Sequence, residues 1–175
     1  MFFILQSALV RVRKVKVHRL LGWFGAGLAV VMVALGFTIA ILMGRFDKHV
    51  LHIADATTFL SVPFGDMLIF SVLVGLAIYW RRKPEYHRRL LFLSTCALLD
   101  APFGRFDYLF NHSLFFLAVD AVILLGVARD LLVNRRIHIV YRVALPSLVI
   151  AQALMVYLWR GAPAWWANIG RALVG

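Results

Sequence analysis

The sequence has little charge, few acids and a single cysteine. Only 15% of its 175 residues are charged and eight are acidic, whereas 63% are hydrophobic and the mean hydropathy is +0.87. A soluble globular domain is about 25% charged and about 45–50% apolar. The composition therefore excludes a soluble enzyme and a disordered chain, and the lone Cys96 excludes an internal disulfide.

Familiar catalytic motifs are also missing. The sequence contains no Cys-x-x-Cys pair, glycine-rich phosphate loop, HExxH helix or nucleophile elbow. An enzyme with one of these sites is not expected. The net charge of +11 and the pI near 10.9 would suggest nucleic acid in a soluble protein. Here the cations form short clusters between apolar runs, which is typical of cytoplasmic loops, so the expected partner is a lipid bilayer and not nucleic acid.

Long apolar runs predict an all-α integral membrane bundle of five helices. Residues 22–44 lack any charge and, at about 1.5 Å per residue, cover about 34 Å, enough for a hydrocarbon core of about 30 Å. Pro102 predicts a kink in the third span because it cannot donate to the Leu98 carbonyl. The predicted spans are 22–44, 59–80, 90–110, 113–133 and 143–159, followed by an interfacial segment at 162–175.

The first ten residues leave two alternatives open. Residues 2–10 are apolar but cover only about 14 Å, too short to cross a bilayer. They lie in the interface, or they form the inner stub of another helix, which gives six spans if the true start lies upstream. Small residues at Gly36, Ala40 and Gly44 predict close helix packing.

The cations predict the orientation. Of the 19 Lys and Arg residues, 14 precede span one or lie between spans two and three or four and five. Basic loops stay in the cytoplasm, so the N-terminus is predicted inside and the C-terminus outside an inner (plasma) membrane. The tryptophans agree with this orientation, because Trp23 and Trp80 fall at the inner boundary and Trp159, Trp165 and Trp166 at the outer one.

Acids within the spans indicate where polar chemistry lies. A charge in hydrocarbon is costly, so such residues face the bundle interior, form pairs or line a wet path. Asp100 falls near the midplane of span three, and Asp107 follows seven residues later. One interpretation is a cavity open to the outside; the alternative is a structural salt bridge of Arg105 with one aspartate. The predicted cavity residues are Asp100, Arg105, Asp107, His112 and Asp120. Asp66 is expected only to occupy a first helical turn.

The histidines suggest two further kinds of site. His18, His87 and His138 stand at cytoplasmic span ends, where a pair could ligate a b-type haem or simply sit at headgroup level. Together with Asp130 they form a predicted inner-face cluster, which either clamps helix ends or binds an anionic headgroup or a proton-carrying cofactor. A weaker candidate for a metal site is the outer loop with His49, His52 and Asp55.

Two stretches carry a resemblance. RRKPEYHRRLLFLSTCALLDAPFGRF at residues 81–106 and RDLLVNRRIHIVYR at residues 129–142, with its Asp130 followed eight residues later by His138, resemble signatures of a group of uncharacterised bacterial integral membrane proteins. VHRLLGWFGAGLAV at 17–30 is similar to their opening. The resemblance implies a multi-pass topology, a further N-terminal span and importance for the matching positions, which are His18, Arg19, Gly22, His87, Arg88, Arg105, Asp130 and His138. It implies no particular activity.

Three functions follow from these features. The first is a small transporter, or an accessory component that contacts other membrane subunits, with a polar cavity between spans three and four. The second is a b-haem electron carrier that uses a histidine pair. The third is a structural membrane subunit whose charges only determine topology.

Overall fold

The computed structural model describes residues 2–53 and 56–175, and this part of the chain is helical without a strand. The predicted all-α fold is therefore confirmed. The helices are α1 (Phe2–Arg11), α2 (Val15–His49), α3 (Ala56–Phe59), α4 (Ser61–Tyr79), α5 (Pro84–Ala97), α6 (Asp100–Phe103), α7 (Asp107–Asn111), α8 (Phe115–Asn134), α9 (Ile139–Arg160) and α10 (Ala164–Val174).

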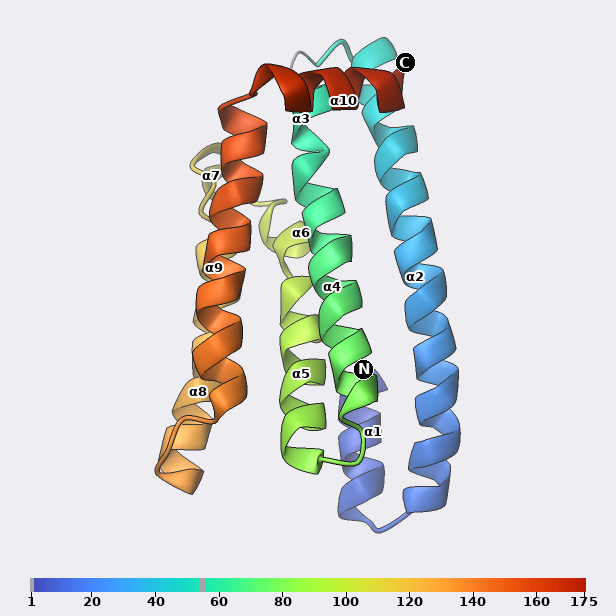
Figure 1. Cartoon of the computed structure of the whole chain (residues 1–175), viewed down its shortest axis with the longest axis vertical. Helices are drawn as coiled ribbons and strands as arrows, with labels where there is room; N and C mark the ends of the chain where they lie inside the picture. The colour runs from blue at the N-terminus through green and yellow to red at the C-terminus, as the bar shows by residue number, and fades with distance from the viewer. Residues whose placement is uncertain (1, 54–55) are drawn as a thin grey trace.

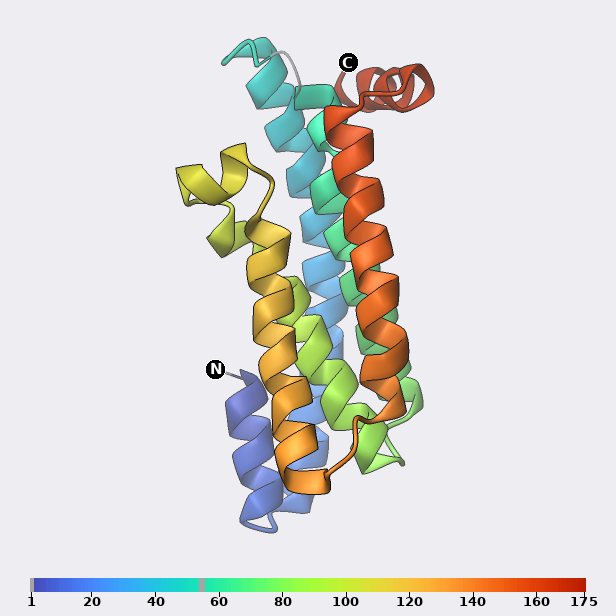
Figure 2. The same cartoon turned by 90° about the vertical axis from the view of Figure 1, so that its left-hand side faces the viewer.

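Five helices run lengthwise through the molecule. In Figures 1 and 2, α2, α4, α5, α8 and α9 stand side by side with alternating direction, and α10 lies across one end. At the opposite end α1 turns back alongside α2 and also contacts α5. We call the α10 end the outer end, and the end with the α1–α2, α4–α5 and α8–α9 connections the inner end.

Among the described residues, three segments are long and apolar enough to cross a membrane: Val15–His49, Ala56–Tyr79 and Ile139–Arg160. The first is far longer than the predicted 22–44, since its 35 residues cover about 52 Å. On average α8 is as apolar as α2 and α9, but its 20 residues include three charged ones, Asp120, Arg129 and Asp130, and it is therefore not among these segments. Length and composition thus support three crossing segments among the described residues, whereas the sequence predicts five.

The prediction of one continuous helix over 90–110 is wrong. The structure has α5 ending at Ala97, followed by the short α6 and α7. Because Pro102 has no N–H, the Leu98 carbonyl loses its helical partner, and the helix ends there instead of bending. In contrast, α9 runs unbroken through Pro146.

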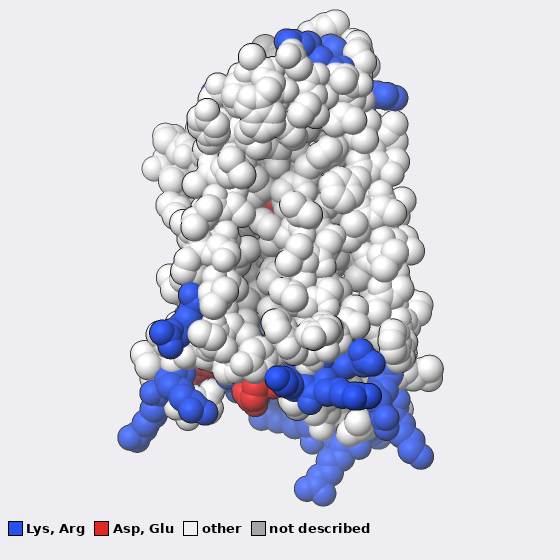
Figure 3. Space-filling model, in the orientation of Figure 1, with Lys and Arg blue, Asp and Glu red and all other residues white. Residues whose placement is uncertain are grey.

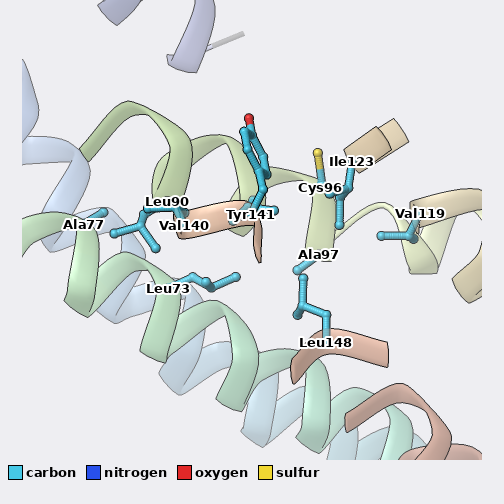
Figure 4. Close-up of a cluster of buried hydrophobic side chains, with 11 residues drawn as sticks. Leu73, Ala77, Leu90, Cys96, Ala97, Val119, Ile123, Val140, Tyr141 and Leu148 are labelled. Atoms are coloured by element: carbon cyan, nitrogen blue, oxygen red, sulfur yellow. The ribbon is translucent and has the colours of Figure 1, made fainter. Parts of the chain in front are cut away.

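The core lies where α4, α5, α8 and α9 meet. Buried side chains from these four helices pack together in Figure 4, among them Leu90, Cys96 and Ile123. Cys96 is a buried apolar residue, as its position in an apolar run indicates. By contrast α2 stands at the edge, with large apolar side chains such as Leu20, Phe24 and Val30 exposed along it.

Close packing holds α10 across the outer end. The Trp166 indole Nε1 donates to the Thr58 carbonyl at 2.9 Å, and Val174 is buried beside Leu60 and Gly44. The small residues Ala40 and Gly44 of α2 therefore serve packing within the chain. Residues 162–175, predicted as a short helix, do form one from Ala164 to Val174.

Gly170 makes the closest of these contacts, and we expect Gly170→Ala to loosen α10. An added Cβ would lie 2.3 Å from the Thr57 carbonyl oxygen, a backbone atom that cannot rotate away. The expected cost is about 1–3 kcal/mol, measured by unfolding in mild detergent. Gly27→Ala is the matched control, because its Cβ meets nothing within 4 Å. Equal stability of the two variants would contradict the close packing of α10 against the Thr57 carbonyl.

Candidate functional site

Buried polar side chains gather at two levels of the bundle. Near the outer end lie Asp66, Asp100 and Gln152, and near the inner end lie Arg89 and Asp130; all five are at most 8% exposed. Buried polar groups are costly unless they are paired, so each level is a candidate site.

The outer level centres on two carboxyl groups. Asp66 is the sixth residue of α4 and Asp100 opens α6, and their two buried carboxyl groups lie next to each other. The helix break after Ala97 starts α6 at Asp100, whose side chain is buried. Two carboxyl groups can share a hydrogen bond only when one of them carries a proton. A proton shared in this way would let both carboxyl groups stay buried without placing two negative charges side by side.

A third acid, Asp120, lies on the far side of a small cavity from Asp66. The Gln152 amide Nε2 donates to Asp120 Oδ1 at 3.1 Å, which joins α9 to α8. Between Asp66 and Gln152 lies a cavity of about 10 Å³, otherwise lined by apolar side chains such as Phe116 and Met155. That volume is about the space that one water molecule needs. Asp100, Asp66, Gln152 and the half-buried Asp120 thus form a row with the small cavity between Asp66 and Gln152, which we call the carboxyl row.

The predicted outer cavity is therefore divided. Asp100 is buried and Asp120 half-buried, but Arg105, Asp107 and His112 are exposed on the segment that follows the helix break. The His112 ring bonds the Tyr108 carbonyl within that segment. Because the break turns the chain outward after α6, Arg105 does not enter the interior as a counter-ion. The neighbour of Asp100 in the interior is instead Asp66. From the sequence, Asp66 was expected only to occupy the first turn of a helix.

The inner level is an ion pair with two parallel hydrogen bonds. Arg89 Nε lies 2.6 Å from Asp130 Oδ2, and Arg89 Nη2 lies 2.9 Å from Asp130 Oδ1. The remaining Arg89 nitrogen, Nη1, donates to the Glu85 carboxylate at 2.5 Å, and Asn134 donates to Asp130 at 3.2 Å. This arrangement ties α5 to α8 across 41 residues of chain.

The predicted inner-face histidines have separate roles around this pair. The His138 ring accepts from the Val140 N–H at the start of α9 and meets the Tyr86 ring at 4.8 Å. His87 bonds the Ala77 carbonyl at the end of α4. His18 lies half-buried on α2. The group that sequence reasoning did not select as a site residue is Arg89, although its spacing of four from Glu85 on one helix was visible. The haem alternative stays a prediction.

His138 predicts a pH dependence of stability. Burial lowers its pKa from the usual value near 6.5, with Arg89 and Arg136 acting in the same direction and Asp130 and Glu85 opposing. The neutral ring caps α9, so its stabilisation is complete above about pH 6.5 and is lost as the pH falls. We expect the melting temperature in detergent to fall between pH 7 and 5.5.

His138→Asn should remove that part of the pH slope, because asparagine caps helices without titrating in this range. His112→Asn is the matched control, since its ring is exposed towards the outer end of the molecule. An unchanged slope in His138→Asn, or a slope lost equally in His112→Asn, would contradict the role given to His138.

The outer loop does not assemble into a metal site among the described residues. His49 ends α2 and His52 is exposed, and Asp55 lies outside the described residues. No group of three His, Cys, Asp or Glu side chains in the described part of the chain is placed to hold a metal ion.

Comparisons with protein-family models, with curated proteins and with solved structures find no match. The function must therefore follow from the geometry of the two buried levels.

Proposed function

We propose that the chain is a multi-pass protein of the bacterial inner membrane and acts as a small proton-handling transporter. The carboxyl row is the observation that carries this proposal. Ionisable groups buried within a membrane bundle are costly, and they typically mark ion or proton paths.

The surface supports the membrane assignment. Large apolar side chains are exposed along the length of the bundle, far beyond the patches of a soluble monomer. Figure 3 shows a white face with a dense blue belt at the inner end and a few cations at the outer end. Such a belt belongs in the cytoplasm, which puts α10 and the C-terminus outside. In this proposal α2, α4, α5 with α6, α8 and α9 cross the bilayer, and α10 lies in the outer interface.

Depth supports a proton path that starts from the outside. Asp66 is five residues from the outer start of α4, and Asp120 five residues from the outer start of α8. At about 1.5 Å per residue both lie about 8 Å below those ends. Asp120 is half-buried and is therefore the member of the row that exchanges protons with the outer side, and the shared proton of Asp66 and Asp100 lies across the cavity from it.

The inner half of the bundle is closed by the apolar cluster of Figure 4, including Leu73, Ile123 and Leu148. In this state the carboxyl row exchanges protons with the outer side only. Transport then requires the helices that carry this cluster to separate at the inner end. The inner ion pair opposes that movement between α5 and α8, because Arg89 and Asp130 hold the two helices together.

The test is proton uptake by proteoliposomes under a potassium-diffusion potential, followed with a trapped pH dye. Vesicles with the wild-type protein should change internal pH several-fold faster than protein-free vesicles. Asp107→Asn is the control variant, because Asp107 is exposed and outside the carboxyl row; its rate should equal the wild-type rate. Wild-type vesicles that behave as protein-free vesicles would contradict the proposal.

A further inference from the structure

An apolar groove of about 450 Å³ lies on the inner half of the molecule, between α4, the start of α5 and α9. This size falls within the range of about 300–1,000 Å³ typical of ligand sites. On α4 the groove extends from Leu68 to Trp80, and on α9 from Ile139 to Ala151. Twelve helical steps on each wall make it about 18 Å long. The lining is aliphatic and aromatic apart from the Ser147 hydroxyl.

The inner end of the groove is aromatic and cationic. Trp80 and Tyr86 line it there, and the Lys83 ammonium lies 5.8 Å from the Tyr86 ring centre. Arg81 and Arg142 flank the lining residues Trp80 and Val143 in the sequence and are exposed. The neighbouring acid Glu85 is already bonded to Arg88 and Arg89. The mouth therefore presents unneutralised positive charge at headgroup depth.

We infer that this groove binds one acyl chain of an anionic phospholipid from the inner leaflet, with the lipid phosphate beside Tyr86, Lys83 and Arg142. The length supports an acyl chain, since half of a hydrocarbon core is about 15 Å. The charge supports an anionic headgroup, because each surface cation attracts such lipids. The inference rests on the membrane orientation in the proposed function and not on proton transport.

The position of the groove gives the lipid a structural consequence. Ile69 and Leu148 line both the deep end of the groove and the small cavity beside Asp66. A lipid chain in the groove packs against Ile69 and Leu148 on the side that faces away from the small cavity. It therefore separates the carboxyl row from the inner leaflet.

The experiment is native mass spectrometry of the delipidated full chain in detergent, with phosphatidylglycerol or phosphatidylcholine of identical acyl chains added. We expect one phosphatidylglycerol to remain bound per chain and phosphatidylcholine to bind at least tenfold more weakly. Ala144→Trp should abolish the bound lipid by filling the groove from α9. Ala121→Trp, on the exposed face of α8, is the matched control and should bind as the wild type does.

A second variant leaves the groove open. Lys83→Gln with Arg142→Gln should reduce the preference for phosphatidylglycerol by about fivefold for each cation removed. Equal binding of both lipids by the wild type would overturn the inference, and so would lipid retained in Ala144→Trp. A wild-type dimer that Ala144→Trp makes monomeric would also overturn it, with a second copy as the occupant. Normal proton uptake alongside absent lipid binding would leave the proposed function standing.

Discussion

Replacing Asp130 by alanine should destabilise the protein by about 3–5 kcal/mol, since it leaves the Arg89 guanidinium buried without its main partner. Arg89 is 4% exposed and Asp130 2%, so water cannot take over the lost hydrogen bonds without opening the α5–α8 contact. Arg89→Ala should cost a similar amount. The measurement is denaturant unfolding in mild detergent.

Two comparisons show whether the cost comes from the buried charge. Arg129→Ala removes a neighbouring cation that is 59% exposed and 3.6 Å from Asp130, and should change stability by less than about 0.5 kcal/mol. The double variant Arg89→Met with Asp130→Leu removes both charges and should recover most of the loss. A loss below about 1 kcal/mol in Asp130→Ala would contradict a buried pair.

The second large effect concerns the carboxyl row. Asp66→Asn should slow proton uptake by proteoliposomes at least tenfold relative to wild type, which corresponds to about 1.4 kcal/mol on the barrier. The asparagine keeps the size of the side chain and its hydrogen bond to Asp100, but it cannot release a proton. Asp100→Asn should have the same effect.

An independent readout distinguishes a lost proton from a lost fold. The infrared band of a protonated carboxyl should be present in the wild type and absent from Asp66→Asn with Asp100→Asn, while the amide bands stay unchanged. Asp107→Asn should retain the carboxyl band. A double variant that keeps the band, or that conducts protons at the wild-type rate, would contradict a shared proton between Asp66 and Asp100.

Local sequence features predicted the parts of the fold that depend on neighbouring residues. Hydropathy indicated the long apolar helices α2 and α9, and the missing N–H of Pro102 identified the carbonyl at which the third helix fails. Whether that failure produces a bend or an end depends on how the next turn packs. Here Asp100 is buried after the break, which periodicity alone could not show.

Contacts between distant segments account for what sequence reasoning missed. Asp130 was selected, but its partner Arg89 lies 41 residues away among five clustered cations, any of which could have paired with it. Asp66 and Asp100 are 34 positions apart, and the packing of α5 along α4 brings the start of α6, and with it Asp100, near Asp66. Short-range patterns carry no information on such pairings, because the pairings depend on how distant segments of the chain pack.

Every proposal above depends on the orientation of the bundle in a membrane, and cysteine labelling tests it directly. In a Cys96→Ala background, single cysteines are introduced as Arg105→Cys at the outer end and Lys83→Cys at the inner end, both at exposed positions. A membrane-impermeant maleimide should label Arg105→Cys in intact cells, and Lys83→Cys only after the membrane is opened. Labelling of Lys83→Cys in intact cells, with Arg105→Cys protected, would contradict the account.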